Sequence, residues 1–512
     1  MSANPETAAP TGRNKPAQGK ERSDAALGHA SQNTPSPEGA KQGGELPSGW
    51  IRLTMGEVGR WFGGGTPSKA NPRFWTGGNI PWVSPKDMKF DLITDAQDHI
   101  TEDAVAQSAT NLVEAGSVLI VVRSGILQHT LPVAVASRQV ALNQDLKAVK
   151  PLENIRSDYL ALALKAFERD ILHTCTKTGT TVQSLELPVF LRFQIPLPPL
   201  PEQRRIVAEI EKQFTRLEAG VAALRRVQAN LKRYRAAVLK AACEGRLVPT
   251  EAALARSPRS TKNGPAAYET GEALLARILT ERRKDWQGRG QYKEPAAPDT
   301  ANLQLLPEGW TWTNLDAAIV SGPQNGVYLP RELYGRGNAI LRIDDYQDGW
   351  VRGVDDLNKV EADQATAAKY QLLSGDLVIN RVNSLTHLGK CLVVHETHER
   401  ALFESNMMKA HLAACVSPRY VEFYLRSRDG RARLISGAKW AVNQASINQE
   451  DVKRTPLPLP PLAEQTRIVA EVERRLSVVE ELESVVTANL LRATRLRQSI
   501  LQKAFSGKLT AR

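Results

Sequence analysis

Pro199-Leu-Pro-Glu-Gln-Arg-Arg-Ile-Val-Ala-Glu-Ile-Glu211 occurs a second time, 262 positions later, as Pro461-Leu-Ala-Glu-Gln-Thr-Arg-Ile-Val-Ala-Glu-Val-Glu473. The register then holds without a gap to the end of the chain, where Gly245-Arg-Leu247 falls on Gly507-Lys-Leu509. A repeat of this length indicates one structural unit used twice. Each copy is a proline-rich segment followed by a long helix, which is the pattern of a spacer and not of an active site.

The repeat also extends upstream of the helices. Leu46-Pro-Ser-Gly-Trp50 matches Leu306-Pro-Glu-Gly-Trp310, and weaker matches follow through both intervening regions. The chain is therefore predicted to alternate globular domains with long helices. The predicted segments are a disordered tail (1–44), globular domain one (45–195), spacer helix one (196–247), a linker with a short helix (248–305), globular domain two (306–455) and spacer helix two (456–512).

Composition narrows the class of partner. The 512 residues carry a formal net charge of +12, which favours an anionic partner such as nucleic acid, although a basic surface without a partner is equally compatible. The four cysteines are far apart and form no CxxC pair, so we expect a reduced, cytoplasmic protein. The sequence shows no apolar run long enough to cross a membrane and no signal-peptide core at its start.

Both long helices show heptad-like spacing. Apolar residues recur at alternate intervals of three and four from Val207 to Val238, and again from Val469 to Ile500. Such a narrow stripe predicts a coiled coil, and two matched copies offer each other a partner, although a helix packed on its own domain is the alternative. Antiparallel pairing would relate the two domains by a pseudo-two-fold axis, as a reader of two DNA half-sites needs. The polar positions in the stripe either fix the register or extend their stems along its edge; they are Gln228, Arg235, Glu483 and Arg497.

The linker contains a short amphipathic segment, predicted as a helix over 270–286. Its apolar residues Leu274, Leu275, Ile278 and Leu279 share one face. This face either docks on a partner or covers the coiled coil, and we favour the second.

Both globular domains are predicted to be mixed α/β. Buried strands are expected at 118–122, 133–136, 377–379 and 391–394, and helices at 158–172 and 420–435. Polar loop residues between them are candidates for DNA contact, because Arg and Lys read guanine, Asn and Gln read adenine, and Ser, Thr and Lys bind phosphates. Any single one is more often an ordinary surface residue, so the prediction concerns the set. In domain one it comprises Thr66, Ser68, Lys69, Trp82, Ser84, Lys86, Arg123, Gln128, Thr180, Thr181 and Gln183, and in domain two Arg331, Tyr334, Arg336, Arg342, Arg381, Asn383, Ser384, Lys439, Asn443 and Gln444.

Catalytic motifs are missing from the sequence. It contains no GxxxxGK[ST] phosphate loop and no Asn- or Asp-Pro-Pro-aromatic motif of adenine methyltransferases. Asp145-Leu-Lys147 has the tail of a nuclease metal site but no clear upstream acidic partner, and the histidines show no metal-ligand spacing. We therefore predict no catalytic residues, no metal site and no cofactor in this chain.

Taken together, these motifs resemble the specificity subunit of type I restriction–modification systems. The resemblance is carried by Leu197-to-Gln203 and Leu459-to-Gln465, both helices, the Gly-Arg-Leu and Gly-Lys-Leu turns, the Leu-Pro-x-Gly-Trp openings and Tyr292-to-Asp299. It covers about residues 45 to 512. It implies two target recognition domains that each read half of a split DNA sequence, and a coiled-coil spacer that docks two methyltransferase subunits. Motor-nuclease subunits complete the enzyme, and S-adenosylmethionine, ATP and magnesium belong to the partners.

Two other functions are compatible with parts of the sequence. A stand-alone DNA-binding regulator would use the same basic repeats without enzyme partners. An enzyme with its own nuclease or methyltransferase centre is disfavoured by the missing motifs.

Overall fold

The computed structural model describes residues 46–177, 182–257, 267–286, 290–347, 349–442 and 444–510. The predicted tail therefore lies outside the described residues. The chain divides into two compact units: unit 1 combines residues 1–211 with 498–512, and unit 2 comprises residues 212–497. No helix within the described ranges combines the length and the apolar character needed to cross a membrane.

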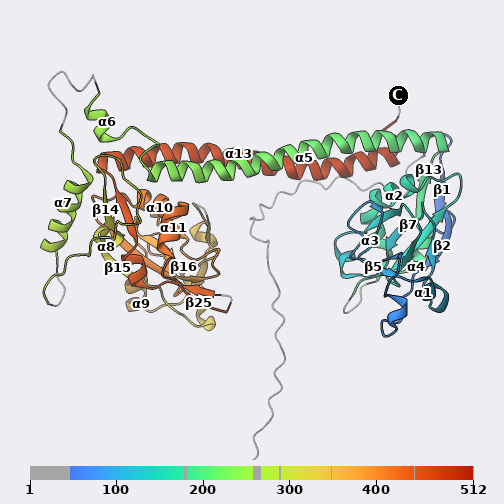
Figure 1. Ribbon diagram of the computed structural model, residues 1–512, viewed down its shortest axis with the longest axis horizontal. Helices are drawn as coiled ribbons and strands as arrows, with labels where there is room; N and C mark the ends of the chain where they lie inside the picture. Colours follow the sequence, from blue (N-terminus) through green and yellow to red (C-terminus); the bar gives the residue numbers. More distant parts are fainter. Residues whose placement is uncertain are drawn as a thin grey trace, which may run out of the picture. The chain divides into compact units, whose positions relative to one another are not determined.

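Unit 1 contains a mixed α/β domain (Figure 1). A sheet in the order β2-β10-β7-β8-β4 lies next to a second sheet in the order β5-β3-β9-β6 in the same domain, and β1-β13 and β11-β12 form short pairs. Its strands are β1 (Ile51–Thr54), β2 (Gly59–Gly63), β3 (Ile80–Val83), β4 (Leu92–Ile93), β5 (Asp98–Ile100), β6 (Leu112–Val113), β7 (Val118–Val121), β8 (Val133–Ala136), β9 (Val140–Leu142), β10 (Leu146–Pro151), β11 (Thr176–Lys177), β12 (Ser184–Leu185) and β13 (Gln194–Leu197). Its helical segments are η1 (Pro72–Phe74), α1 (Glu102–Gln107), η2 (Gly125–Gln128), α2 (Ser157–Ala166), α3 (Glu168–Cys175), α4 (Leu187–Arg192), the start of α5 (Leu200–Cys243) and the end of α13 (Leu462–Phe505).

Unit 2 contains the second mixed α/β domain. Its sheets have the orders β15-β24-β20-β22, β19-β16-β23 and β21-β26-β25, with the pairs β14-β27 and β17-β18. The strands are β14 (Thr311–Asn314), β15 (Ile319–Asn325), β16 (Tyr334–Leu341), β17 (Tyr346–Gln347), β18 (Trp350–Val351), β19 (Asn358–Val360), β20 (Leu377–Asn380), β21 (Val382–Asn383), β22 (Cys391–Val393), β23 (Leu402–Phe403), β24 (Met407–Leu412), β25 (Lys439–Ala441), β26 (Gln444–Ser446) and β27 (Pro456–Leu459). The helical segments are α6 (Glu251–Ala255), α7 (Gly271–Lys284), α8 (Leu315–Ala318), η3 (Arg331–Leu333), η4 (Val354–Asp356), α9 (Gln364–Tyr370), η5 (Glu396–His398), α10 (Pro418–Arg426), α11 (Arg428–Leu434) and α12 (Gln449–Lys453).

The four predicted strands are confirmed as β7, β8, β20 and β22, and their residues are buried except for the half-buried Val135, in keeping with their continuous apolar character. The predicted domain helices are wrong in one respect, because each is two helices. In domain two the break falls at Ser427, whose extended backbone ends α10 and whose hydroxyl accepts a hydrogen bond from the Gly430 amide to begin α11. In domain one the break falls at Phe167, between α2 and α3.

The repeated Glu-Gln pair clamps each long helix to its domain. Gln203 is fully buried; its Oε1 accepts from the Arg156 amide at 2.9 Å and its Nε2 donates to Asn154 and Pro198 carbonyls. Gln465 repeats this arrangement with the Ser417 amide at 2.8 Å and the Pro460 carbonyl. The motif therefore pairs the N-cap amides of α2 and α10 and carbonyls of the segments before the long helices.

The glutamate of each Glu-Gln pair also binds the Leu-Pro-x-Gly-Trp motif that begins its domain. Trp50 donates its indole N–H to Glu202 at 3.1 Å, and Trp310 donates to Glu464 at 2.9 Å. The strands that follow the two tryptophans, β1 and β14, pair antiparallel with the proline-rich strands β13 and β27. The two sequence anchors are thus neighbours in space, which is why they repeat together.

Each long helix ends at a glycine with a left-handed backbone. Gly245 has φ of 66° and Gly507 has φ of 74°, conformations that L side chains adopt at a cost. A Cβ at Gly245 would lie 2.4 Å from the Pro307 side chain, and one at Gly507 would lie 2.2 Å from that of Pro47. The Gly-Arg-Leu and Gly-Lys-Leu turns are therefore required both as helix caps and by the close approach of the proline in each opening motif.

Within unit 2, α5 and α13 lie side by side, and their contacts run in opposite directions (Figure 1). Leu231 packs with Val479 and Val486. Arg235 lies 3.6 Å from Glu480, and Arg497 lies 3.1 Å from Glu218. Adding the repeat offset of 262 to Arg235 and Glu218 yields Arg497 and Glu480, so these two ion pairs are equivalent under the repeat.

The linker helix differs from its prediction. Leu274 and Ile278 of α7 are buried in the core of the second domain, in the same cluster as Trp310 and Leu315. Arg282 pairs with Asp316 at 3.3 Å on α8. The apolar face therefore packs into the core of the second domain beside α8 and β14, and that core also contains Val238 and Ile468 of the long helices.

Candidate nucleic-acid interface

In the second domain, a three-stranded ribbon brings several predicted contact residues together. Asn383 of β21 pairs with Ala445 of β26, and Gln444 of β26 pairs with Ala441 of β25. Residues about sixty positions apart in sequence thereby share one small sheet. We name β21, β25 and β26 the recognition ribbon; the predicted residues on it or beside it are Arg381, Asn383, Ser384, Lys439 and Gln444. Asn443 lies outside the described residues.

The outer strand of the recognition ribbon is exposed. Lys439 and Trp440 face solvent, and Trp440 is 69% exposed. Val442, which follows β25, is 92% exposed. Neither Trp440 nor Val442 was among the predicted contact residues, although their position between Lys439 and Gln444 could have indicated them. A ribbon with an accessible indole, an ammonium group and an amide offers the side-chain types that stack on bases, bind phosphates and read base edges.

Arg381 anchors the inner edge of the recognition ribbon. Its amide donates to the Asn406 carbonyl at 2.8 Å and its Nη1 to the Ser405 carbonyl at 3.2 Å. Its Nε is buried without a hydrogen-bond partner in the described structure. The Arg381 side chain is therefore half-buried and held against the loop that precedes β24.

The first domain contains the equivalent site. Arg123 forms a β-bridge with Ser184, and the Ser124 amide donates to the Gln183 carbonyl at 3.0 Å. The Arg123 guanidinium pairs with Asp145 at 2.6 Å. Gln128 is exposed on the adjacent η2. The predicted residues Arg123, Gln128 and Gln183 are thus brought together, whereas Thr180 and Thr181 lie outside the described residues.

Asp145 belongs to this site as an ion-pair partner. Its carboxylate pairs with Arg123, and its amide donates to the Asn143 side-chain oxygen. Among the residues that the structure describes, no group of three or more His, Cys, Asp or Glu side chains is placed to hold a metal ion.

The remaining predicted residues of domain one divide into surface and core. Ser68 and Lys69 are exposed, Thr66 is exposed and hydrogen-bonded to Gln144, and Lys86 pairs with Asp98 at 2.8 Å. Trp82 and Ser84 are buried, with only 4% and 6% of their surface exposed.

Trp82 and Ser84 are therefore corrected to supporting residues. The Trp82 indole donates to the Gly65 carbonyl at 3.0 Å and packs edge-on against Trp75, and Ser84 donates to Asp87 at 2.8 Å. Both side chains hold the loops that carry Thr66 and Lys86, and neither is accessible to a macromolecule.

The remaining predicted residues of domain two follow η3 and β16, on a sheet separate from the recognition ribbon. Arg331 is exposed, and Tyr334 is half-buried. Arg336 is paired with Glu361, and Arg342 lies 3.3 Å from Glu404. The structure does not bring these four side chains onto the ribbon.

The described chain thus contains two α/β domains, each clamped to a long helix and each bearing a polar loop cluster. The family described as type I restriction modification DNA specificity domain matches residues 47–223. Residues 47–223 thus resemble such a domain, and the predicted resemblance to specificity subunits of type I restriction–modification systems is confirmed.

Named relatives agree with this assignment. The chain is 47% identical over 159 residues to the specificity subunit of the type I restriction enzyme EcoR124I/EcoR124II of Escherichia coli, covering 31% of this chain and 39% of that protein. It is 28% identical over 335 residues to the EcoKI specificity subunit of Escherichia coli strain K12, covering 65% and 61%. These matches therefore span less than two thirds of either relative. Their names agree with the expected role in recognition and not catalysis.

A solved structure shares the fold. A chain from a structure that addresses complex assembly and conformational transition of the type I R-M system is 20% identical, with a TM-score of 0.60 over 91% of this chain and 99% of that one. This likeness supports the mixed α/β architecture with long helices.

Proposed function

We propose that this chain is the non-catalytic DNA-specificity subunit of a type I restriction–modification enzyme. Recognition domain one (45–195) reads one half of a bipartite target, and recognition domain two (306–455) reads the other. The observation that carries the proposal is the recognition ribbon, which gathers Arg381, Asn383, Lys439 and Gln444 beside the exposed Trp440. The family match over the first domain and the net charge of +12 support it.

The paired helices act in this proposal as an antiparallel coiled-coil spacer that docks two methyltransferase subunits. Support comes from the ion pairs Arg235–Glu480 and Arg497–Glu218, which the repeat offset interchanges. Such an interchange is the property of a pseudo-two-fold axis across an antiparallel pair. A pseudo-symmetric reader suits two half-sites on duplex DNA. Motor-nuclease subunits would join in the cytoplasm to complete the enzyme.

The test exchanges one domain. The chain is co-produced with its methyltransferase subunits, and the methylated motif is mapped by sequencing. Replacing residues 46–195 by those of a relative is expected to change one half of the motif only. A change in both halves would contradict the modular reading. DNA binding without methylation by the assembled complex would instead favour a stand-alone regulator.

A further inference from the structure

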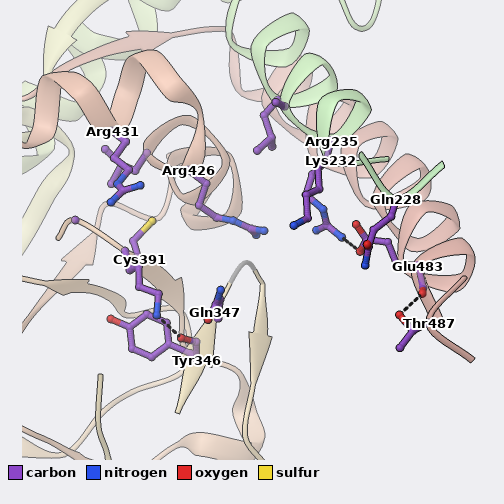
Figure 2. A pocket seen from close by; sticks show the side chains of 15 residues that line it. Gln228, Lys232, Arg235, Tyr346, Gln347, Cys391, Arg426, Arg431, Glu483 and Thr487 are labelled. Atoms are coloured by element: carbon purple, nitrogen blue, oxygen red, sulfur yellow. Dashed lines mark hydrogen bonds and ion pairs between the residues drawn. The ribbon is translucent and has the colours of Figure 1, made fainter. Parts of the chain in front are cut away.

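A basic hollow lies within unit 2, between α5 and the second domain (Figure 2). Its volume is about 610 Å³. Two of its walls come from different parts of the chain, one from α5 and α13 and the other from α10, α11 and the loops around β17 and β22. The basic side chains that line it are Lys232, Arg235, Lys390, Arg426 and Arg431, and the acidic one is Glu483.

The cations converge from both walls. Figure 2 shows the Arg426 guanidinium pointing from α10 toward α5, where Lys232 and Arg235 lie, with Gln347 beside the gap. Like charges that face one another across a hollow repel, and an anion between them removes that cost. Gln347 adds an amide donor at the mouth. The lining therefore matches an anion with several acceptor oxygens.

Neighbouring groups hold several of these cations in place. Arg426 lies 3.2 Å from the buried Glu422, and Arg235 lies 3.0 Å from Glu483. Their guanidinium groups are thereby oriented before any ligand arrives, which lowers the entropy cost of binding. Lys232 is exposed and forms no ion pair within the described part of the chain. It is the lining cation that is best placed to pair with an incoming anion.

The hollow is connected to the recognition ribbon. Arg431 donates to the carbonyls of Leu385 and Thr386 and, at 3.0 Å, to that of Leu388. These residues belong to the loop that starts at the ribbon residue Asn383 and ends at Lys390 on the hollow wall. Carbonyls are neutral acceptors, so they position the Arg431 guanidinium without cancelling its charge. The same loop therefore has a predicted base contact, Asn383, at one end and a residue that lines the hollow, Lys390, at the other.

From this geometry we propose that the hollow binds phosphate groups of the DNA backbone next to the bases read by the second domain. The proposal rests on the proposed function and adds to it a DNA contact that does not depend on the base sequence. Lys and Arg contacts to phosphate position a protein on the duplex, whereas base edges carry the sequence information. Binding there would place DNA against the spacer helix α5 as well as against the recognition ribbon.

The experiment measures DNA affinity of the chain assembled with its methyltransferase subunits over a series of salt concentrations. Each phosphate contact contributes about 0.9 to the slope of log K against log salt. Lys232→Gln is expected to reduce the slope by about 1, equally on target and non-target duplexes, with the methylated motif unchanged. Gln347→Glu, on the opposite wall, is expected to weaken binding to both duplexes as well.

Arg226→Gln is the matched control. Arg226 is also exposed on α5 and also carries one charge, but it does not line the hollow. Its slope is expected to equal that of the unaltered complex. Circular dichroism of each variant confirms that the helices are intact.

Three results would overturn the proposal. The first is an unchanged slope in both hollow variants. The second is loss of assembly with the methyltransferase subunits in Lys232→Gln with an unchanged slope in the complexes that do form, which would assign the hollow to an acidic protein side chain. The third is calorimetric binding of inorganic phosphate that Lys232→Gln abolishes without a change in slope, which would assign it to a free anion. Failure of the proposed function is separate, because it would appear as a complex that methylates no bipartite motif.

Discussion

The clamp glutamate at the start of α13 is buried, whereas the clamp glutamate at the start of α5 is half-buried, although the glutamines of both clamps are buried. Glu464 is fully buried and accepts from the Glu251 amide at 3.0 Å as well as from Trp310. Glu202 is half-buried and lies 3.4 Å from Thr510 besides its bond to Trp50. The difference comes from α6 in the linker, a segment that occurs once. The repeated residues therefore form the same hydrogen bonds in both copies, whereas their burial depends on which other segments pack against each copy.

The largest expected effect is the loss of a clamp tryptophan. Trp310→Ala is expected to destabilise the second domain by about 3–5 kcal/mol, because it opens a cavity and removes a donor from a buried carboxylate. Trp50→Ala should cost the first domain less, because water can reach Glu202. Hydrogen exchange of the α10 and α2 amides measures the two domains separately. Trp310→Phe keeps most of the packing and isolates the hydrogen bond; equal losses in the two alanine variants would contradict the burial difference.

The clamp glutamines should behave alike. Gln203→Ala and Gln465→Ala each leave a part-buried amide, of Arg156 and Ser417, without its acceptor. Each is expected to cost about 1–3 kcal/mol in its own domain. The two variants are matched controls for one another, and the same exchange measurement applies. A large cost in one domain only would show that the two clamps are not equivalent.

The two equivalent arginines of the helix pair should differ. Arg235 is 16% exposed and pairs with Glu483 and Glu480, whereas Arg497 is 42% exposed beside a Glu218 that is 63% exposed. Arg235→Glu is expected to destabilise the helix pair by about 1–3 kcal/mol, and Arg497→Glu by about 1 kcal/mol or less. Thermal unfolding followed by helical circular dichroism measures both.

The reciprocal exchange Arg235→Glu with Glu483→Arg should recover most of the loss if the pair sets the register. No recovery would favour the alternative in which the arginine stem merely packs along the seam.

The smallest effect concerns pH. Burial raises the pKa of Glu464 above its ordinary 4.5, and this outweighs the hydrogen bonds from the Glu251 amide and Trp310, which lower it. A carboxyl whose pKa is raised by folding binds its proton more tightly in the folded state, so its contribution to stability is complete below pH 4.5 and is lost as pH rises through the folded pKa. Glu464→Gln is expected to flatten this part of the stability profile. An unchanged profile in denaturant titrations at several pH values would contradict it.

Local sequence patterns were sufficient for the elements that have a strong local signal. The buried strands, the two long helices and the glycine caps follow from apolar runs, heptad spacing and a residue free to adopt positive φ. The breaks at Phe167 and Ser427 escaped prediction because helical periodicity continues across them, and only the cap geometry at Ser427 reveals the second one.

The candidate site was predictable only as a set of residue types. Lys439 and Gln444 were identified by their chemistry, but so were Trp82 and Ser84, which the fold buries. Exposure depends on contacts between residues far apart in sequence, such as Trp82 with Gly65 and Trp75, and residue type does not report it. For the same reason, residue type gave no indication that Trp440 is exposed.

By itself, the sequence determined that one unit is used twice, that each unit is an α/β domain joined to a long helix, and that the net charge favours an anionic partner. Periodicity, motif spacing and net charge indicate these properties. All three can be read without knowing which distant residues are in contact. Only the tertiary structure decided that Glu and Gln clamp each helix to its domain, that α7 covers the second domain, and that Lys232 and Arg426 face the same hollow. Those outcomes depend on which surfaces come into contact when the chain folds. Contacts between residues far apart in the sequence leave no pattern in the local sequence around either residue.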